Sequence, residues 1–404
     1  MVSFFIVHSP MQNPSKIQSC IAPAMMKTAK IAAQLIIITF LMSIMNVVEG
    51  GSDHVKGQLK IGDGGDDSKG LFIMGDSSVD CGENTLFYSL LHGSFSLLPC
   101  NGSDSTIPHF LAKLMGLPKV PPFYVENDTV SGMLHGLNFG SALATIISTN
   151  SSSPRFQSLN QQLRQVLDVI QLLQLQLGFE TANQFIRSSV FHLSFGKDDY
   201  IHFLRHNSSL TSETRHESGC QNEFCRDLVD EMMKVVRELY DANARKIICL
   251  GILPLGCAPR TRFEWSSIKL RENKERGCIK EINQLVSEYN VKLREQIYDL
   301  KIKLPDLHIT FCDVYQGVMD VLAKPNRYGF KDVTTACCGI GWLGARVGCL
   351  SRSVACNHSS SHVWWDLYNP TEAVNSLLTD SFWSNHPFRS LCHPLTVQDL
   401  FHAL

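Results

Sequence analysis

The segment Leu71-Phe72-Ile73-Met74-Gly75-Asp76-Ser77-Ser78 consists of a short apolar run followed by a glycine and polar residues. An apolar run of this length that ends at a turn residue is typical of a buried strand. Three further apolar runs occur along the chain, over residues 190–194, 246–250 and 307–311. We interpret the four runs as strands of one sheet, and Ser77 as a residue that follows the first of them.

Helical patterns separate these runs. Apolar residues recur on one face of a helix over residues 224–239 and 278–297, and a Gln-rich stretch over 155–177 is similar. Strands that alternate with helices predict an α/β fold with three layers (α/β/α), in which helices cover both faces of a central parallel sheet. Ligands bind beyond the carboxyl ends of the strands in such sheets. Ser77 and residues 196–200, which follow the first and second strands, are therefore expected at the functional edge.

Several motifs in a fixed order along residues 71–385 carry a resemblance to a known family. Besides the opening segment, these motifs are Gly136-Leu137-Asn138-Phe139-Gly140, Phe195-Gly196-Lys197-Asp198-Asp199-Tyr200, Leu253-Pro254-Leu255-Gly256-Cys257-Ala258-Pro259, Asn326-Arg327-Tyr328-Gly329-Phe330, Cys337-Cys338-Gly339 and Val363-Trp364-Trp365-Asp366-Leu367-Tyr368-Asn369-Pro370-Thr371. Together they resemble the plant GDSL esterase/lipase family within the SGNH hydrolases. The resemblance implies a flavodoxin-like SGNH hydrolase fold, formed as a single domain over residues 70–404, and hydrolysis of carboxylic (acyl or lipid) esters. The nucleophile motif of the general α/β-hydrolases, G-x-S-x-G, does not occur around Ser77.

The resemblance implies a serine triad that this chain does not complete. Ser77 corresponds to the nucleophile, and its backbone N–H to one oxyanion donor, while Asp366 corresponds to the residue that orients the base. In the family the base is a histidine three residues later, where this chain has Asn369. A serine hydroxyl needs a positioned base to attack at neutral pH, and an amide cannot take its proton. In subtilisin, loss of the triad histidine lowers kcat about 2 × 10⁶-fold.

The oxyanion hole departs from the family as well. Asp198 stands where the family has an asparagine that donates a hydrogen bond to the oxyanion. An ionised aspartate donates none, and the loss of one such donor typically raises the barrier by about 2.7–4 kcal/mol. A protonated Asp198 could donate, which would need a pKa strongly raised by burial or by the neighbouring Asp199. Gly102 is the candidate for a further oxyanion donor, although the arginine of the family's corresponding segment is missing.

Other residues could replace the missing base, and Asn369 has a structural interpretation. The sequence Asn369-Pro370-Thr371-Glu372 predicts a helix start with Asn369 as the N-cap residue. Asp198 is one candidate for the acceptor of the Ser77 proton. Four histidines near the closing motif are interpreted as surface residues rather than as substitute bases: His358, His362, His386 and His393.

The N-terminal region has the pattern of a secretory signal. Lys27 and Lys30 precede an apolar run over residues 31–48, and small residues follow. This pattern predicts a cleaved signal peptide over residues 25–50, with an uncleaved membrane anchor as the alternative. Residues 1–24 are expected to form a disordered upstream extension, and residues 51–69 a flexible linker. Five glycosylation sequons agree with secretion, at Asn101, Asn127, Asn150, Asn207 and Asn357. The family resemblance implies delivery to the plant apoplast or cell wall.

The fourteen cysteines fit an oxidising compartment. Removal of Cys20 with the leader leaves an odd number, so at least one thiol is free or pairs between chains. The cluster Cys337, Cys338, Cys349 and Cys356 admits a zinc site, but disulfides are the favoured interpretation. The sequence from Gly339 to Gly344 matches the dinucleotide motif G-x-G-x-x-G without its strand–helix context, and we reject that interpretation. We expect no cofactor and no metal ion.

The overall charge restricts the possible partners. A formal net charge of -2 over 404 residues gives no electrostatic reason to expect binding to nucleic acid or to an anionic membrane surface. The expected partner is a small-molecule acyl ester or lipid, with no stable membrane insertion after signal cleavage. Two functions remain open. One is an ester hydrolase with a substitute base and low activity, and the other is a non-catalytic protein that binds an ester, acyl or glycan ligand in the retained cleft.

Overall fold

The computed structural model describes residues 69–80, 105–124, 129–147, 157–206, 223–268 and 277–403. These residues belong to one compact unit that begins at Asp67. The expected upstream extension, signal peptide and linker lie outside the described residues, apart from Lys69 at the end of the linker. Among the helices that can be described, none has both the length and the apolar character needed to cross a bilayer.

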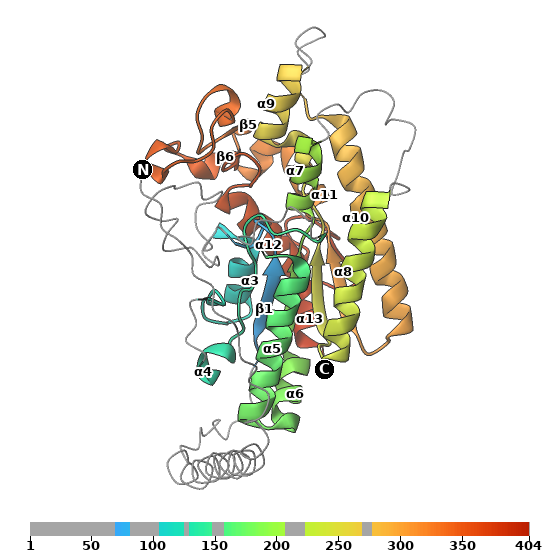
Figure 1. Cartoon of the computed structure of the whole chain (residues 1–404). Coiled ribbons are helices and arrows are strands. Elements are labelled where there is room, and N and C mark those ends of the chain that lie inside the picture. The colour runs from blue at the N-terminus through green and yellow to red at the C-terminus, as the bar shows by residue number, and fades with distance from the viewer. Residues whose placement is uncertain are drawn as a thin grey trace, which may run out of the picture. The chain divides into compact units, whose positions relative to one another are not determined.

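A central sheet of five strands forms the middle of the fold (Figure 1). Its order is β1-β2-β3-β4-β7; the first four strands are parallel, and β7 pairs antiparallel with β4. The strands are β1 (Leu71–Gly75), β2 (Val190–Ser194), β3 (Lys246–Leu250), β4 (His308–Cys312) and β7 (Cys392–His393). The four strands predicted from apolar runs are thus confirmed to within one residue at each end.

The free edge of β1 pairs with the segment over residues 135–139. The Leu71 N–H donates to His135 O at 3.1 Å, and the Phe139 N–H donates to Ile73 O at 2.8 Å. Because this segment follows β1 in the chain and lies parallel to it on the side away from β2, the order around β1 is that of a flavodoxin-like sheet. The predicted three-layer α/β/α architecture is confirmed.

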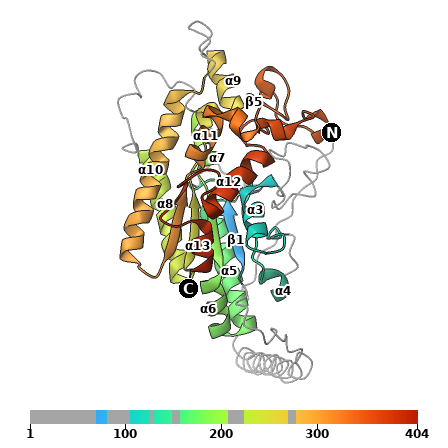
Figure 2. The ribbon, with the colours of Figure 1, turned by 180° about the vertical axis from the view of Figure 1, so that it is seen from behind.

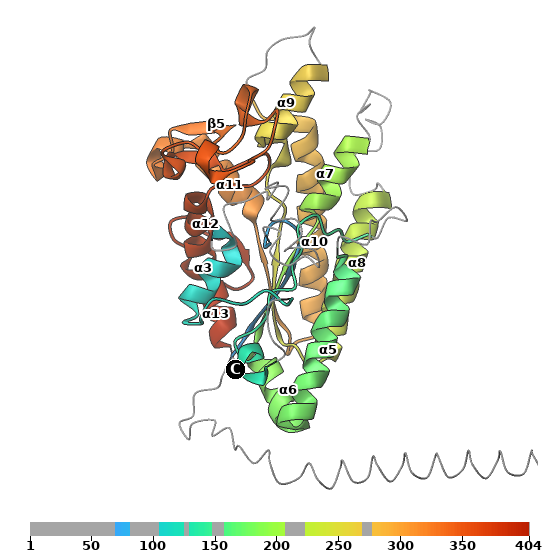
Figure 3. The same cartoon turned by 60° about the vertical axis from the view of Figure 1, so that its left-hand side comes forward.

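Helices cover both faces of the sheet, as Figure 3 shows with the strands seen between two layers. One layer contains α5 (Leu159–Leu177), α8 (Glu223–Asp241) and α10 (Lys280–Lys303). The other contains α3 (Ile107–Leu114), α12 (Glu372–Ser384) and α13 (Val397–His402), which lie in front of the sheet in Figure 2. The remaining helices are α4 (Val130–Met133), α6 (Phe179–Ser188), α7 (Lys197–His206), α9 (Pro259–Ile268) and α11 (Val314–Ala323). A second, two-stranded sheet consists of β5 (Asp332–Ala336) and β6 (His362–Trp364).

The long helices bury the apolar faces that their sequences predict. In α8 the buried residues include Leu228, Met232, Val235, Val236 and Leu239, which lie within the range 224–239 predicted to carry an apolar face. Helix α5 begins later than the Gln-rich stretch. Ser158 caps it, and a reciprocal hydrogen bond joins the Ser158 N–H to the Gln161 side chain. The capping box therefore determines where this helix begins.

Asp199 anchors the segment over residues 141–147 to helix α7. Its buried carboxyl accepts a hydrogen bond from the Ile146 N–H at 3.0 Å, and the Ile147 N–H lies 3.4 Å away. Burial raises the pKa of Asp199 to about 8, although the two N–H donors act in the opposite direction. The Asp199 carboxyl is therefore protonated in the folded protein over a pH range in which an exposed aspartate is ionised.

Gly136 permits the close contact between residues 135–139 and β1. Its φ is +95°, and a Cβ atom at this position would lie 2.0 Å from Leu71 O. Gly116 also has a positive φ, of +72°, but a Cβ atom there would meet no other atom within 4 Å. A side chain at Gly116 would therefore strain the backbone alone, whereas a side chain at Gly136 would strain the backbone and also clash with β1.

We predict that Gly136→Ala destabilises the protein more than Gly116→Ala does. Both substitutions place a Cβ on a left-handed backbone, but only the first forces the 135–139 segment away from β1. The free energy of unfolding from urea titration should fall by about 1–3 kcal/mol more for Gly136→Ala. Equal losses for the two variants would contradict the close packing of this segment on β1.

The Asp199 pKa predicts a pH dependence of stability. Between the unfolded value of 3.8 and the folded value of about 8, the folded state keeps a proton that the unfolded state loses. Stability therefore falls as the pH rises through this window, by up to about 1.4 kcal/mol per pH unit from this group. Asparagine resembles the protonated carboxyl, so Asp199→Asn should flatten the decline in unfolding free energy between pH 5 and pH 8.

The matched control for this measurement is Asp168→Asn on the exposed face of α5. It should leave the slope of unfolding free energy against pH unchanged. If Asp199→Asn has the same slope as the parent protein, the Asp199 carboxyl is not the source of the pH dependence.

Candidate active site

Ser77 lies at the carboxyl edge of the sheet, where the chain turns after β1. The turn is held to β2 by a hydrogen bond of 3.0 Å from the Asp76 N–H to Ser194 O. After β2 the chain passes through Gly196, whose φ is +103°, and enters α7 at Lys197. The expectation that Ser77 and residues 196–200 meet at this edge is confirmed, because Ser77 contacts Asp198 directly.

The Asp198 carboxylate accepts hydrogen bonds from both donors of Ser77. The Ser77 hydroxyl donates to Oδ1 at 2.6 Å, and the Ser77 N–H donates to Oδ2 at 3.0 Å. A third donor, the Leu143 N–H, reaches Oδ2 at 2.9 Å. In all three contacts Asp198 is the hydrogen-bond acceptor. A substrate oxyanion at the Ser77 N–H would have to replace this carboxylate.

Asp76 is a second buried carboxyl beside Ser77 and Asp198. It accepts hydrogen bonds from the Ser78 N–H at 2.8 Å and from the Asp198 N–H at 3.2 Å. Burial, reinforced by the negative charge of Asp198, raises the pKa of Asp76 to about 6. The hydrogen bonds of Asp76 therefore hold the turn that carries Ser77 to the start of helix α7.

The prediction that Asn369 is a helix N-cap is wrong. Helix α12 begins at Glu372, and Thr371 occupies the cap position without a side-chain cap bond. The Thr371 N–H donates to Val363 O, in strand β6, at 2.9 Å. This pairing keeps residues 370–371 extended, so the helix starts two residues later than a cap at Asn369 would require. The Asn369 side chain points instead to Asp366.

Asn369 bridges a carboxylate and an ammonium group. Its Nδ2 lies 3.2 and 3.1 Å from the two oxygens of Asp366, and its Oδ1 accepts a hydrogen bond of 2.5 Å from Lys197 Nζ. Burial raises the pKa of Asp366 to about 6, against the lowering effects of its N–H donors and of the Lys197 charge. The arrangement keeps the aspartate at its expected place but puts an amide where the base would stand.

Sequence reasoning missed Lys197. This side chain is 2 % exposed and belongs to the same motif as Asp198. A lysine directly before the oxyanion position, at the end of a buried strand, was the available signal. Its contact with Asn369, 172 residues later, could not be read from the sequence.

A pocket that opens to solvent lies beside Ser77. Apolar side chains form one part of the wall: Ile107, Phe195, Leu250, Ile252, Leu253 and Val314. Polar side chains form another part: Ser77, Ser105, Thr106, Lys197, Asn369 and Asn375. This combination of an apolar wall and a few polar groups suits a small organic ligand. The predicted donor Gly102 lies outside the described residues, so its role stays a prediction.

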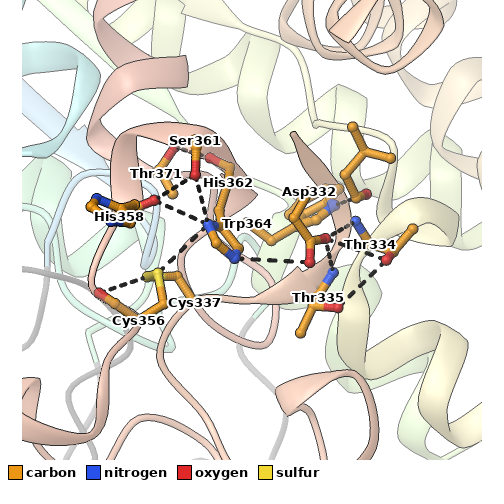
Figure 4. A network of polar contacts seen from close by, with 11 residues as sticks. Asp332, Thr334, Thr335, Cys337, Cys356, His358, Ser361, His362, Trp364 and Thr371 are labelled. Carbon is orange, nitrogen blue, oxygen red and sulfur yellow. Dashed lines mark hydrogen bonds and ion pairs between the residues drawn. A yellow bond between two sulfur atoms is a disulfide. The ribbon is translucent and has the colours of Figure 1, made fainter. Parts of the chain in front are cut away.

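None of the four candidate histidines lines this pocket. His358, His386 and His393 are exposed. Figure 4 shows His362 in a separate network, where Nδ1 lies 3.1 Å from His358 O and Nε2 lies 3.8 Å from an oxygen of Asp332. In the part of the chain that is described, the Ser77 hydroxyl therefore makes its hydrogen bond to Asp198.

The cysteine cluster forms two disulfides, Cys337–Cys356 and Cys338–Cys349, which confirms the favoured interpretation. His362 lies beside the first of them, but two sulfurs bonded to each other offer no thiolate to a metal ion. Further disulfides are Cys257–Cys278 and Cys312–Cys392. Cys249 is buried and free, which accords with the odd count of cysteines after the leader. The Asn357 sequon is exposed.

The G-x-G-x-x-G match lies inside this disulfide-bonded loop. Residues Trp342–Gly344 form a short 3₁₀ turn, and no α-helix starts there. A Cβ atom at Gly339 would lie 1.9 Å from Gly344 O. Close packing of the loop on itself therefore accounts for these two glycines.

Comparison with known proteins agrees with the motifs. A model of the GDSL-like lipase/acylhydrolase family matches residues 71–382. Among similar proteins of Arabidopsis thaliana, GDSL esterase/lipase At1g71250 is 28% identical over 82% of this chain and 88% of its own length. GDSL esterase/lipase At5g22810 is 30% identical over 77% of this chain and 87% of its own length. GDSL esterase/lipase 7 is 28% identical over 82% of this chain and 91% of its own length.

The match covers strands β1 to β4, Ser77, the Lys197–Asp198 pair and the Asp366–Asn369 loop together. Ester hydrolysis is the function that these relationships support. The chain belongs to the GDSL-like lipase/acylhydrolase family.

Proposed function

We propose that this protein is a secreted GDSL-family protein that binds carboxylic esters beside Ser77 and hydrolyses them at a low rate. The observation that carries the proposal is the double contact of Asp198, which accepts both the hydroxyl and the N–H of Ser77. The pocket beside Ser77 is kept, whereas the groups that would accelerate the reaction are altered. Binding is therefore better supported than fast turnover.

The chemistry follows from this contact. The Ser77 Oγ lies 2.6 Å from Asp198 Oδ1, which is within reach for proton transfer to a general base. When Oγ bonds to the ester carbonyl carbon, its proton passes to Asp198, which returns it to the departing alcohol. Water then hydrolyses the acyl-enzyme in the same way. The same carboxylate faces the negative charge that develops on the carbonyl oxygen, and this repulsion slows the reaction.

Secretion is supported by several independent features. The basic and apolar pattern before residue 50 has the form of a signal peptide. Four disulfides among the described residues suit an oxidising compartment, and the Asn357 sequon is exposed. The family resemblance suggests the plant apoplast or cell wall as the destination.

A second candidate is a non-catalytic protein that binds an ester, acyl or glycan ligand. One observation favours it: the bridge from Lys197 through Asn369 to Asp366 fills the base position with groups that take no proton from Ser77. The two candidates share the pocket and differ in whether Ser77 reacts.

We predict slow hydrolysis of p-nitrophenyl acetate and butyrate that depends on both Ser77 and Asp198. Ser77→Ala should abolish turnover because the nucleophile is lost. Asp198→Asn alone should also lower kcat, since the amide cannot accept the Ser77 proton and no histidine replaces it. Ser188→Ala on helix α6, whose hydroxyl contacts Phe185 O in the same helix, is the matched control and should leave the rate unchanged.

Two results would overturn the low-rate proposal. Turnover by the parent protein that equals that of Ser77→Ala would support the non-catalytic candidate. A rise in kcat for Asp198→Asn alone would show that Asp198 only blocks the oxyanion position and does not act as a base.

We predict that the double variant Asp198→Asn/Asn369→His gains activity. The imidazole would form a hydrogen bond with Asp366. The neutral amide at position 198 would leave the Ser77 N–H free to donate to an oxyanion. An added general base is worth about 10²–10⁴-fold. Asn369→His alone should gain less, because Asp198 still occupies the Ser77 donors and Lys197 would donate to the new ring. Adding Lys197→Ala to the double variant should raise kcat further.

Labelling of Ser77 with a fluorophosphonate, followed by intact mass, gives an independent measurement of the same effect. The double variant should react faster than the parent protein. Equal labelling rates and equal kcat values would mean that these two positions do not limit the reaction.

A further inference from the structure

Lys197 is a buried cation with one neutral partner. Its side chain is 2 % exposed, and its ammonium group donates to the amide oxygen of Asn369 at 2.5 Å. Within the described residues it forms no ion pair with a carboxylate. An ammonium group has three N–H donors, and burial of a charge without an ion partner is costly. Within the described residues, one of these three donors has a hydrogen-bond partner.

The nearby carboxylates already have other donors. Asp198 accepts from Ser77 and from the Leu143 N–H. Asp366 accepts from the Tyr368 N–H at 3.0 Å and from Asn369. Their charges act on Lys197 from a distance, but neither places an oxygen against the ammonium group.

Lys197 is also the charged residue of the pocket wall. The other described residues that line the pocket are apolar or carry hydroxyl or amide groups, and no acidic side chain is among them. Among the described lining residues the ammonium group is therefore the charged group that an entering ligand would meet, although the buried carboxylates of Asp76 and Asp366 offset part of its charge. Such a wall favours an anion with an apolar body over a neutral molecule of the same shape.

We propose that this pocket binds an organic carboxylate, with the carboxylate on Lys197 and its apolar chain against Phe195, Leu250 and Ile252. The inference rests on the pocket of the proposed function and deepens it, because it names the free acid, and not the neutral ester, as the better ligand. A bound acid would leave the Ser77–Asp198 contact in place. The chain of the ligand can be aliphatic or aromatic, since the apolar wall offers both kinds of side chain.

Calorimetric titration with octanoate and with octanamide tests the proposal, since the two probes differ in charge and have the same chain. Hydrogen bonds to a charged group predict that octanoate binds about 10- to 100-fold more tightly than octanamide. Cinnamate and cinnamamide form the aromatic arm of the experiment. Tighter binding by the anion in one arm only would identify the kind of chain that the pocket accepts.

Substitutions at Lys197 test whether its ammonium group causes the preference for octanoate over octanamide. Lys197→Met should remove the preference for octanoate, and Lys197→Gln, which keeps a donor for Asn369, should do the same if the methionine variant does not fold. Lys246→Met is the matched control, because Lys246 is also buried and its Nζ donates to Phe401 O at 3.0 Å, outside the pocket. This control should keep the preference.

Equal affinities of the parent protein for octanoate and octanamide would overturn the proposal, and so would a Lys197→Gln variant that keeps the preference. The measurement uses no ester and is performed in the Ser77→Ala background as well. Failure of the hydrolysis proposal would therefore leave this result unaffected, and the two failures can be distinguished.

Discussion

The hydrogen bonds of the Asp198 carboxylate join the segments that make up the site. The Ser77 donors come from the turn after β1, the Leu143 N–H comes from the segment that Asp199 anchors, and Asp198 itself lies in the first turn of α7. A carboxylate can accept from all three donors at once, whereas an amide has one acceptor oxygen. The charge at this position thus supports the local architecture and at the same time opposes the chemistry that the family is named for.

The two halves of the site compensate each other electrically. Asp198 adds a negative charge beside the nucleophile, and Lys197 adds a positive charge one residue before it. Asn369 suits this arrangement because its amide can accept from the ammonium group and donate to Asp366 together. A neutral imidazole has one acceptor nitrogen, so a hydrogen bond from Lys197 would compete with the Ser77 proton for it. Asp198, Lys197 and Asn369 are therefore parts of one connected arrangement.

The sequence predicted those parts of the structure that depend on local pattern. Short apolar runs located β1 to β4, and the rule for parallel sheets placed Ser77 beside residues 196–200. The Asn369 prediction failed because Asn-Pro-Thr-Glu is a good local helix start, whereas pairing of Thr371 with Val363 extends the chain there. Burial of Lys197 and its contact with Asn369 depend on how distant segments pack. The pairing of the cysteines could not be deduced for the same reason.

The bridge through Asn369 has a consequence for the descent of this protein. A histidine at position 369 would lie against the Lys197 ammonium group, which now donates to the Asn369 amide oxygen. An amide at position 198 would lose hydrogen bonds that the Asp198 carboxylate accepts from two other segments. The step at position 198 alone should lower kcat, and the step at position 369 alone should gain less than the two together. Selection acting on single substitutions would therefore tend to keep the present site.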